Sequence, residues 1–446
     1  MKGCPVGAYE KDSITGIVRH LDDQCIGCQY CIFTCPYEVP KYNADKGIVR
    51  KCDMCAGRLA EGEAPACVQA CPSAAISITV VDTQDAIDDA QAGVFLPGAP
   101  SPGITIPTTV YKTKEPLPRN AIPADFYTVH AAHVHTPLVW MLVLTQLSVG
   151  AFCVSEFFDR LIPGDALSPI RQWHGLLALA LGLVAMGAST AHLGRPQYAF
   201  RAILGIRTSW LSREILAFGA FAGVAAVYAA ALWQAEHAPV VTAMTWLPEV
   251  AARSLPYLGP VVAVTGLAGV FCSVMVYAVT GRRWWNGAYT GMKFFMTATV
   301  LGLAFSTAFA AIIAKLVAEE PAAVMAPWFA FSAKALAAAT MLALLGEASV
   351  LTHLRDRQRG DLWRSARLLV GELRPLSGMR LVVAVLGGAV VPFVFLVSSE
   401  GVPFSFQLAA VVASALLLVA GALIERTLFF AAVSAPRMPG RPGGAP

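Results

Sequence analysis

The chain has 446 residues, of which 56% are hydrophobic and only 14% charged, and its mean hydropathy is +0.59. Soluble proteins carry about a quarter charged residues, so this composition excludes an ordinary soluble protein. A net charge of +4 is too small to indicate nucleic-acid binding, and the basic residues lie beside apolar stretches instead.

The first 71 residues contain nine of the eleven cysteines, spaced like iron–sulfur ligands. The motifs are C-x₂-C-x₂-C-x₃-C-P, C-x₂-C and C-x₃-C-P, preceded by an isolated C-P. Three cysteines at the first spacing wrap one [4Fe–4S] cube, whereas zinc ribbons do not use it. Clustered thiols also indicate metal ligands in a reducing compartment. The predicted ligands are Cys4, Cys25, Cys28, Cys31, Cys35, Cys52, Cys55, Cys67 and Cys71.

The composition changes along the chain and predicts four segments. Residues 1–95 are predicted to form an α+β ferredoxin-like domain that holds the [4Fe–4S] clusters. Residues 96–130 contain seven prolines, which remove backbone donors and favour an extended linker or arm over a helix. Residues 131–435 are predicted to form the membrane domain, and 436–446 a disordered tail.

Eight apolar stretches follow the linker. Most approach or exceed the roughly 20 residues that a helix needs to cross a bilayer. A spanning backbone must satisfy its own hydrogen bonds, so an all-α polytopic domain of eight transmembrane helices is expected. The stretches are 136–157, 172–192, 211–234, 257–280, 289–315, 328–352, 380–398 and 404–430.

Basic residues are distributed unequally between the two ends of these stretches. With eight spans and counting from Lys112 onward, twenty Lys and Arg residues fall on the side of both termini and five on the opposite side. The positive-inside rule therefore predicts a multi-pass protein of the plasma membrane whose cluster domain and termini face the cytoplasm.

Two sets of segments carry a resemblance to one group of enzymes. CIGCQYCIFTCPYEVPKYN and KCDMCAGRLAEGEAPACVQACPSAAI, within residues 1–80, resemble the iron–sulfur subunit of DMSO reductase-type molybdenum enzymes. HTPLVWMLVLTQLSVGAF, HLGRPQYAFRAILGIRTSWLSREI and LIERTLFF, within residues 135–430, resemble the membrane anchor of the same enzymes. The resemblance implies a fusion of the two subunits, without haem and with the molybdopterin in a separate catalytic subunit.

The resemblance leaves two pairings of cysteines with clusters open. The motifs supply a first trio and a second trio of ligands, namely Cys25, Cys28 and Cys31, and Cys52, Cys55 and Cys67. In the family's pattern Cys4 would complete the first trio, and the second trio would need a cysteine upstream of Met1. That pattern predicts a truncated start, with a cysteine codon before Met1 and more than two clusters. In a two-cluster ferredoxin pattern, Cys71 would complete the first trio and Cys35 the second.

A quinol site is expected at the junction of the second and third stretches. Oxidising a quinol releases protons as electrons leave, which calls for an ionisable acceptor near neutral pH, and histidine suits that role. The resemblance implies that His192 meets menaquinol or ubiquinol and that Glu214 lines the site. As alternatives, His192 caps a helix end, and Glu214 pairs with Arg213 or Arg195.

Other residues of the apolar half have structural interpretations. Glu425 and Arg426 form an acidic–basic pair that resembles one in the family and that a salt bridge explains equally well. Tyr277, Trp284 and Trp285 are predicted to belong to the aromatic belt at the membrane surface.

The predicted function is that of a membrane-bound electron-transfer and anchor subunit. Electrons would pass from the quinol pool through the clusters to a molybdopterin-containing catalytic subunit, which reduces an oxyanion or an N- or S-oxide in anaerobic respiration. The chain itself would catalyse only the quinol half-reaction. The alternatives are a component of a polysulfide, tetrathionate or nitrite reductase-like complex, a redox-gated transporter, and a stand-alone quinone-linked ferredoxin.

Overall fold

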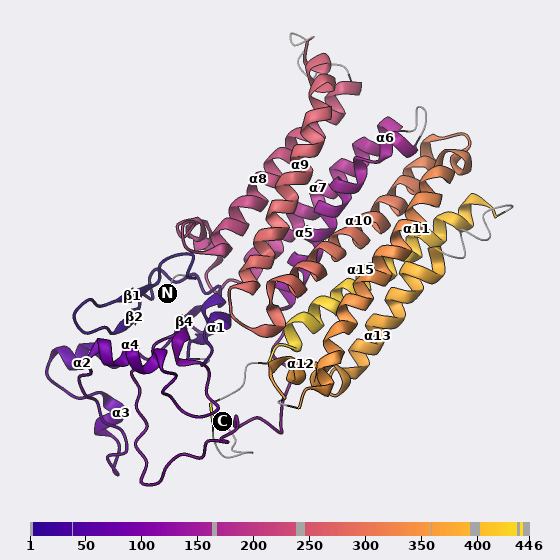
Figure 1. Cartoon of the computed structure of the whole chain (residues 1–446). Coiled ribbons are helices and arrows are strands. Elements are labelled where there is room, and N and C mark those ends of the chain that lie inside the picture. Colours follow the sequence, from indigo (N-terminus) through magenta and orange to yellow (C-terminus); the bar gives the residue numbers. More distant parts are fainter. Residues whose placement is uncertain are drawn as a thin grey trace. The chain divides into compact units, whose positions relative to one another are not determined.

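The computed structural model describes residues 3–37, 39–162, 167–237, 246–357, 359–392, 402–434 and 438–439 (Figure 1). These residues divide into two compact units. The cluster unit comprises Met1–His130, Leu193–Thr208 and Ser434–Pro446, and the helical unit comprises Ala131–His192 and Ser209–Val433. The tail predicted to be disordered, 436–446, lies outside the described residues except for 438 and 439.

The cluster unit is built from two small antiparallel hairpins and four short helices, which confirms the predicted ferredoxin-like α+β class. In the first hairpin Tyr9 pairs with His20, and in the second Lys41 pairs with Arg50. Gly47 lies in the second turn with φ of +64°, a conformation that favours glycine. The strands are β1 (Tyr9–Lys11), β2 (Val18–His20), β3 (Lys41–Asn43) and β4 (Ile48–Arg50), and the helices are α1 (Tyr30–Thr34), α2 (Ala56–Ala60), α3 (Ala66–Gln69) and α4 (Thr83–Gln91).

The proline-rich segment 96–130 contains a single 3₁₀ turn, η1 (Pro102–Ile104), and no α-helix, and all of its residues are described. Pro123 forms an isolated antiparallel bridge with Pro439, and the amide of Ala124 donates to the carbonyl of Met438 at 3.2 Å. The segment thus meets residues near the C-terminus within the cluster unit.

In its described residues, the helical unit contains seven helices that are long and apolar enough to cross a membrane. An eighth span is present if α12 (Asp361–Val370) and the helical residues Arg374–Val390, which meet it at 75°, count as one. The predicted stretch 380–398 runs into residues 393–398, which lie outside the described part. The chain is therefore a multi-pass membrane protein. The seven helices are α5 (Thr136–Ser155), α7 (Leu167–Ala191), α8 (Trp210–Glu236), α9 (Leu247–Ala278), α10 (Gly287–Val317), α11 (Pro321–Ala348) and α15 (Phe404–Ala431).

Helix α5 lies at the centre of the helical unit, where it packs against α7 and α10 (Figure 1). Of the 18-residue apolar part of α5, 83% is buried inside the protein, compared with 28% in α7, α11 and α15. The rest of the surface of these three helices is available to contact lipid. Glycines allow α5 and α10 to approach closely, because a Cβ on Gly150 would lie 3.2 Å from the Cα of Gly302. Helices in lipid gain no hydrophobic stabilisation from associating, so they depend on the close van der Waals packing that small residues allow.

Buried charges join α5, α10 and α15. The Nζ of Lys293 lies 2.9 Å from a carboxylate oxygen of Glu425, and both side chains are at most 4% exposed. Arg426 lies 3.4 Å from the other oxygen of Glu425 and donates to Gln146 at 2.9 Å. The predicted ion pair at 425 and 426 is therefore part of a larger network. Charges inside a membrane protein pair in this way because an isolated one is costly.

The aromatic-belt prediction for Tyr277, Trp284 and Trp285 was wrong. All three side chains are buried in the helical unit. Both indole N–H groups donate to the carbonyl of Phe429, at 2.9 and 3.1 Å. Phe429 lies near the end of α15, where backbone carbonyls lack hydrogen-bond partners within the helix. The two tryptophans supply donors to the Phe429 carbonyl and hold this end of the helix in place.

Candidate functional site

Four of the predicted ligands come together in the cluster unit. Cys25 is buried in a small core, and Cys4 and Cys28 pack against that core. Burial raises the pKa of the Cys28 thiol, and the nearby Cys31, Cys4 and Cys25 thiolates raise it further. Burial also raises the pKa of Cys31 to about 11. Crowded buried thiols become stable thiolates beside a cation such as iron, so these four residues fit the ligands of one cluster.

The two C-P motifs at the ends of the cysteine array have the same local geometry. The Sγ of Cys4 accepts a hydrogen bond from the amide of Ala8 at 3.3 Å. The Sγ of Cys71 accepts one from the amide of Ala75, also at 3.3 Å. In both cases the donor lies four residues after the cysteine. The isolated Cys4 is thus built like a cysteine of the complete motif.

The loops between the cysteines contain residues in the left-handed region. Gly27 and Gln29 flank Cys28 with φ of +71° and +59°. In the second C-x₂-C motif, Met54 and Cys55 have φ of +56° and +53°. Such conformations are costly for residues other than glycine and are concentrated at functional sites. Their presence in both motifs supports a ligand-binding role for both loops.

The remaining cysteines lie nearer the surface. Cys52 and Cys67 are exposed, whereas Cys35, Cys55 and Cys71 are partly buried. Among the described residues, no three His, Cys, Asp or Glu side chains are close enough to bind one metal ion. A [4Fe–4S] cube needs a wider arrangement, because each of its four thiolates binds a different iron. The first trio with Cys4 fits that requirement better than a zinc site.

The structure adds His20 to the cluster surroundings. Its Nδ1 lies 2.9 Å from a carboxylate oxygen of Asp22. Burial opposes its charged form, but contacts with Cys25 and Asp22 raise the pKa of His20. No motif points to this residue, because only the pairing of β2 with β1 and the fold of the next loop bring it beside Cys25.

His192 directly follows α7 in the helical unit. Its Nδ1 is buried and has no hydrogen-bond partner in the described part of the chain. Burial lowers the pKa of His192 to about 4 and the neighbouring His135 lowers it further, while a hydrogen bond with the backbone of Ser189 opposes the shift, so the imidazole is neutral at pH 7. The ring of His135 lies 5.2 Å from that of His133. No sequence pattern groups His133 and His135 with His192.

Glu214 lies on α8, and its side chain is buried. It accepts a hydrogen bond from the hydroxyl of Ser273 on α9. The alternative of an ion pair with Arg213 or Arg195 was wrong, because neither pair forms among the described residues. Glu347 and Glu425 differ from it, since each lies within 3 Å of a cation, Arg380 at 2.7 Å and Lys293 at 2.9 Å.

Glu214 is therefore a buried carboxyl group with no ion pair in the part of the chain that the structure describes. A carboxyl group in that setting is suited to exchange a proton with a bound partner. No hydrogen bond or ion pair joins His192 and Glu214 within the described ranges.

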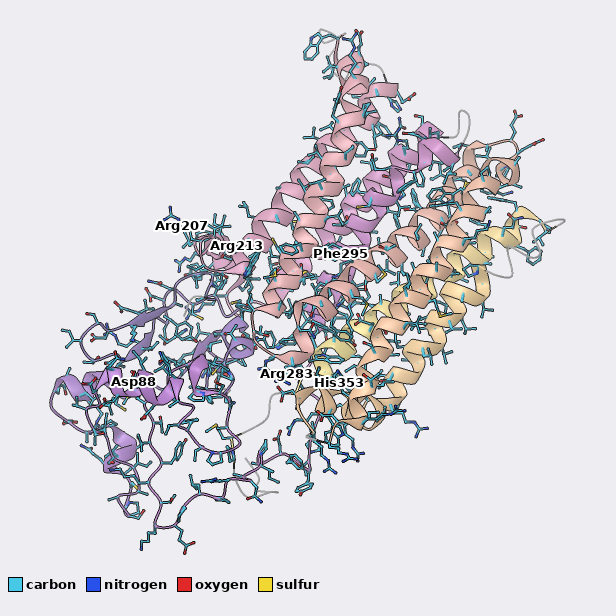
Figure 2. The ribbon with its side chains drawn as sticks, in the orientation of Figure 1. Asp88, Arg207, Arg213, Arg283, Phe295 and His353 are labelled. Carbon is cyan, nitrogen blue, oxygen red and sulfur yellow. The ribbon has the colours of Figure 1, made fainter. Side chains whose placement is uncertain are left out.

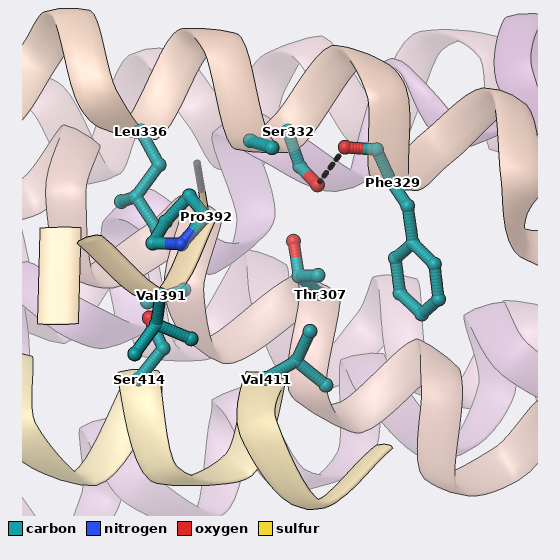
Figure 3. A pocket seen from close by; sticks show the side chains of 10 residues that line it. Thr307, Phe329, Ser332, Leu336, Val391, Pro392, Val411 and Ser414 are labelled. Atoms are coloured by element: carbon teal, nitrogen blue, oxygen red, sulfur yellow. Dashed lines mark hydrogen bonds between the residues drawn. The ribbon is translucent and has the colours of Figure 1, made fainter. Parts of the chain in front are cut away.

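A pocket in the helical unit lies elsewhere, between α10, α11 and α15 (Figure 3). Three hydroxyl side chains, of Thr307, Ser332 and Ser414, line it together with apolar groups. Trp328 donates to Thr307 at 3.2 Å, and Ser414 donates to the carbonyl of Gly387 at 2.5 Å. None of the predicted site residues lines this pocket.

Two family models match the chain. The DMSO reductase anchor subunit (DmsC) model matches residues 129–432, and the 4Fe-4S dicluster domain model matches residues 1–81. The matches confirm the predicted fusion of an iron–sulfur domain and an anchor domain.

Curated relatives match the N-terminal part. An anaerobic dimethyl sulfoxide reductase polypeptide of Haemophilus influenzae is 41% identical over 113 residues, which is 25% of this chain and 53% of that protein. Probable anaerobic dimethyl sulfoxide reductase chain YnfG of Escherichia coli is 47% identical over 81 residues, 18% of this chain and 39% of the relative. The formate dehydrogenase-O iron-sulfur subunit of E. coli is 42% identical over 76 residues, 17% of this chain and 25% of that subunit. The chain thus spans at most about half the length of these relatives. With its anchor model covering residues 129–432, the chain belongs to the DMSO reductase anchor subunit (DmsC) family and carries a 4Fe-4S dicluster domain before the anchor.

Proposed function

We propose that this protein is the membrane-bound electron-transfer subunit of a DMSO reductase-type complex. It takes electrons from a quinol and delivers them to a separate molybdopterin-containing catalytic subunit. The observation that carries this proposal is the convergence of Cys4 with the first trio in a unit that also contains Leu193–Thr208. That segment begins at the residue after His192.

Cys4 and the first trio are proposed to bind one [4Fe–4S] cluster, and the second trio to bind another. A bound cluster supplies one-electron transfer. The protein holds the ligand loops, and backbone amides donate to the sulfurs, as at Cys4 and Cys71. Such hydrogen bonds tune the reduction potential of a cluster.

His192 and Glu214 are proposed to form the quinol site. Oxidation of one quinol to the quinone releases two electrons and two protons. The neutral imidazole of His192 accepts a proton as the quinol is oxidised, and Glu214 takes part in moving protons away from the site. Ser273 holds the Glu214 carboxyl in place. Menaquinol and ubiquinol present the same hydroxyl chemistry to these groups.

Charge distribution supports a cytoplasmic position of the cluster unit. Figure 2 shows Arg283 and His353 at the same end of the helical unit. The connections at that end include the arginine-rich segment 355–374. The positive-inside rule assigns such an end to the cytoplasm. Protons released there would be consumed on the same side by reduction of an N- or S-oxide, so this complex would build no proton gradient.

The catalytic partner is tested by purification of the protein from its source membranes in mild detergent. We expect a larger polypeptide with about one molybdenum per chain to co-purify, and addition of quinol with an N- or S-oxide to give turnover. Purified material that lacks molybdenum, or that reduces quinone with a reduced sulfur donor instead, would contradict the proposal.

A further inference from the structure

A segment between two membrane spans is built into the cluster unit. Leu193–Thr208 belongs to this unit, whereas the residues directly before and after it belong to the helical unit. The segment contains the 3₁₀ helix η3 (Pro196–Ile203). Its apolar side chains Leu193, Tyr198 and Ala202 pack into the core that contains Cys25, together with Val6, Ala8, Ile26 and Ile48.

The segment contacts the ligand loop, the residues from Cys25 to Cys28, through backbone atoms. The amide of Gly194 donates to the carbonyl of Gly27 at 3.4 Å, and the amide of Arg195 donates to that of Ile26 at 3.1 Å. A Cβ on Gly27 would lie 2.9 Å from the Cα of Gly194, which is closer than real Cβ atoms approach. Residues 26 and 27 separate two ligands of the first trio, so the segment lies directly on the ligand loop.

The side chain of Arg195 reinforces this contact. Its Nη1 donates to the carbonyl of Asp22 at 2.8 Å, and its Nε donates to the carbonyl of Lys46 at 3.3 Å. Asp22 lies three residues before Cys25, and Lys46 lies in the turn between β3 and β4. One guanidinium thus ties the chain that enters the ligand loop to the second hairpin. A lysine has no fixed fork and does not reproduce both contacts.

We propose that Arg195 is a positioning residue for the cluster held by Cys4 and the first trio, an inference that rests on the proposed function. Hydrogen bonds, nearby charge and solvent exposure set the reduction potential of a cluster. Arg195 brings a positive charge to the ligand loop and restrains its backbone. The electronic properties of this cluster therefore depend on a residue from the membrane half of the sequence.

The test compares three variants of the full-length protein: Arg195→Gln, Arg195→Lys and Arg207→Gln. Arg207 belongs to the same segment and is exposed, and Figure 2 shows its side chain at the outside of the ribbon. Its substitution removes the same charge from the segment and leaves the contacts of Arg195 with Asp22 and Lys46 in place. Each protein is reduced with dithionite and followed by low-temperature EPR for midpoint potential and g-values, with iron and sulfide measured in parallel.

We expect Arg195→Gln to lower the midpoint potential of this cluster and to change its g-values, and Arg195→Lys to give a smaller shift in the same direction. Quinol-driven reduction of the cluster should slow roughly 10-fold or more in Arg195→Gln, as for other groups that support metal ligands. Arg207→Gln should match the wild type. If Arg195→Gln loses the cluster, Arg195→Lys must retain it and still show the shift.

Wild-type potentials and spectra in both Arg195 variants would overturn the proposal, and so would an equal shift in Arg207→Gln. The dithionite titration uses no quinol. A wild-type protein that fails to oxidise quinol would therefore refute the proposed function while the result for Arg195 would stand.

Discussion

Replacing Glu214 with glutamine is expected to lower the rate of quinol oxidation by about 10²–10⁴-fold, the range that positioned proton-transfer groups contribute. Glutamine keeps the shape of the side chain and a carbonyl that accepts from Ser273, but it cannot take up a proton. We therefore expect kcat to fall with little change in KM. The measurement is steady-state oxidation of a short-chain quinol by the purified protein with an artificial electron acceptor.

Two further variants define the cause of the effect. Ser273→Ala removes the hydroxyl that holds Glu214 and should lower the rate less than Glu214→Gln. Glu236→Gln changes an exposed carboxylate at the other end of the same helix and should have no effect. The role of Glu214 would be refuted if its glutamine variant oxidised quinol at the wild-type rate with an intact cluster content.

Replacing Cys4 with serine is expected to alter the same cluster as replacing Cys28. Both cysteines belong to the group of thiols that converges around Cys25, so Cys4→Ser and Cys28→Ser should change or abolish one and the same EPR signal. If the chain holds two clusters, loss of one would lower iron and acid-labile sulfide by about half. The measurement combines metal and sulfide analysis with low-temperature EPR of the reduced protein.

The same series distinguishes the two pairings of cysteines with clusters. Cys71→Ser should leave the signal of Cys4 and Cys28 unchanged, because Cys71 lies outside the group around Cys25. Cys153→Ser, on α5, is the control and should leave both signals unchanged. An unaltered spectrum in Cys4→Ser, together with loss of the Cys28 signal in Cys71→Ser, would show that the two-cluster ferredoxin pairing holds instead.

The sequence alone predicted features that depend on local patterns. Seven of the eight apolar stretches overlap helices long enough to span a membrane, because length and hydropathy decide whether a segment crosses lipid. Prolines kept 96–130 free of α-helix because they remove amide donors. The cysteine spacing predicted the dicluster domain because the size of a [4Fe–4S] cluster fixes how far apart its cysteine ligands can lie along the chain.

Features that depend on contacts between distant residues were missed. Trp284 and Trp285 looked like interfacial aromatics, but their partner is the carbonyl of Phe429 in the last span. Ser273 lies 59 residues from Glu214 and carries no motif. The inclusion of Leu193–Thr208 in the cluster unit follows from glycine contacts with the ligand loop, which an apolar pattern does not encode.

Freeze-quench EPR decides whether electrons from a quinol enter the cluster of Cys4 and the first trio. Oxidised, purified protein is mixed with a reduced short-chain quinol under argon and frozen at increasing times. We predict that the signal that Cys4→Ser and Cys28→Ser alter appears first and that Glu214→Gln delays it. A protein whose signals appear with dithionite but never with quinol, or one that contains zinc and no inorganic sulfide, would show that this electron path does not exist.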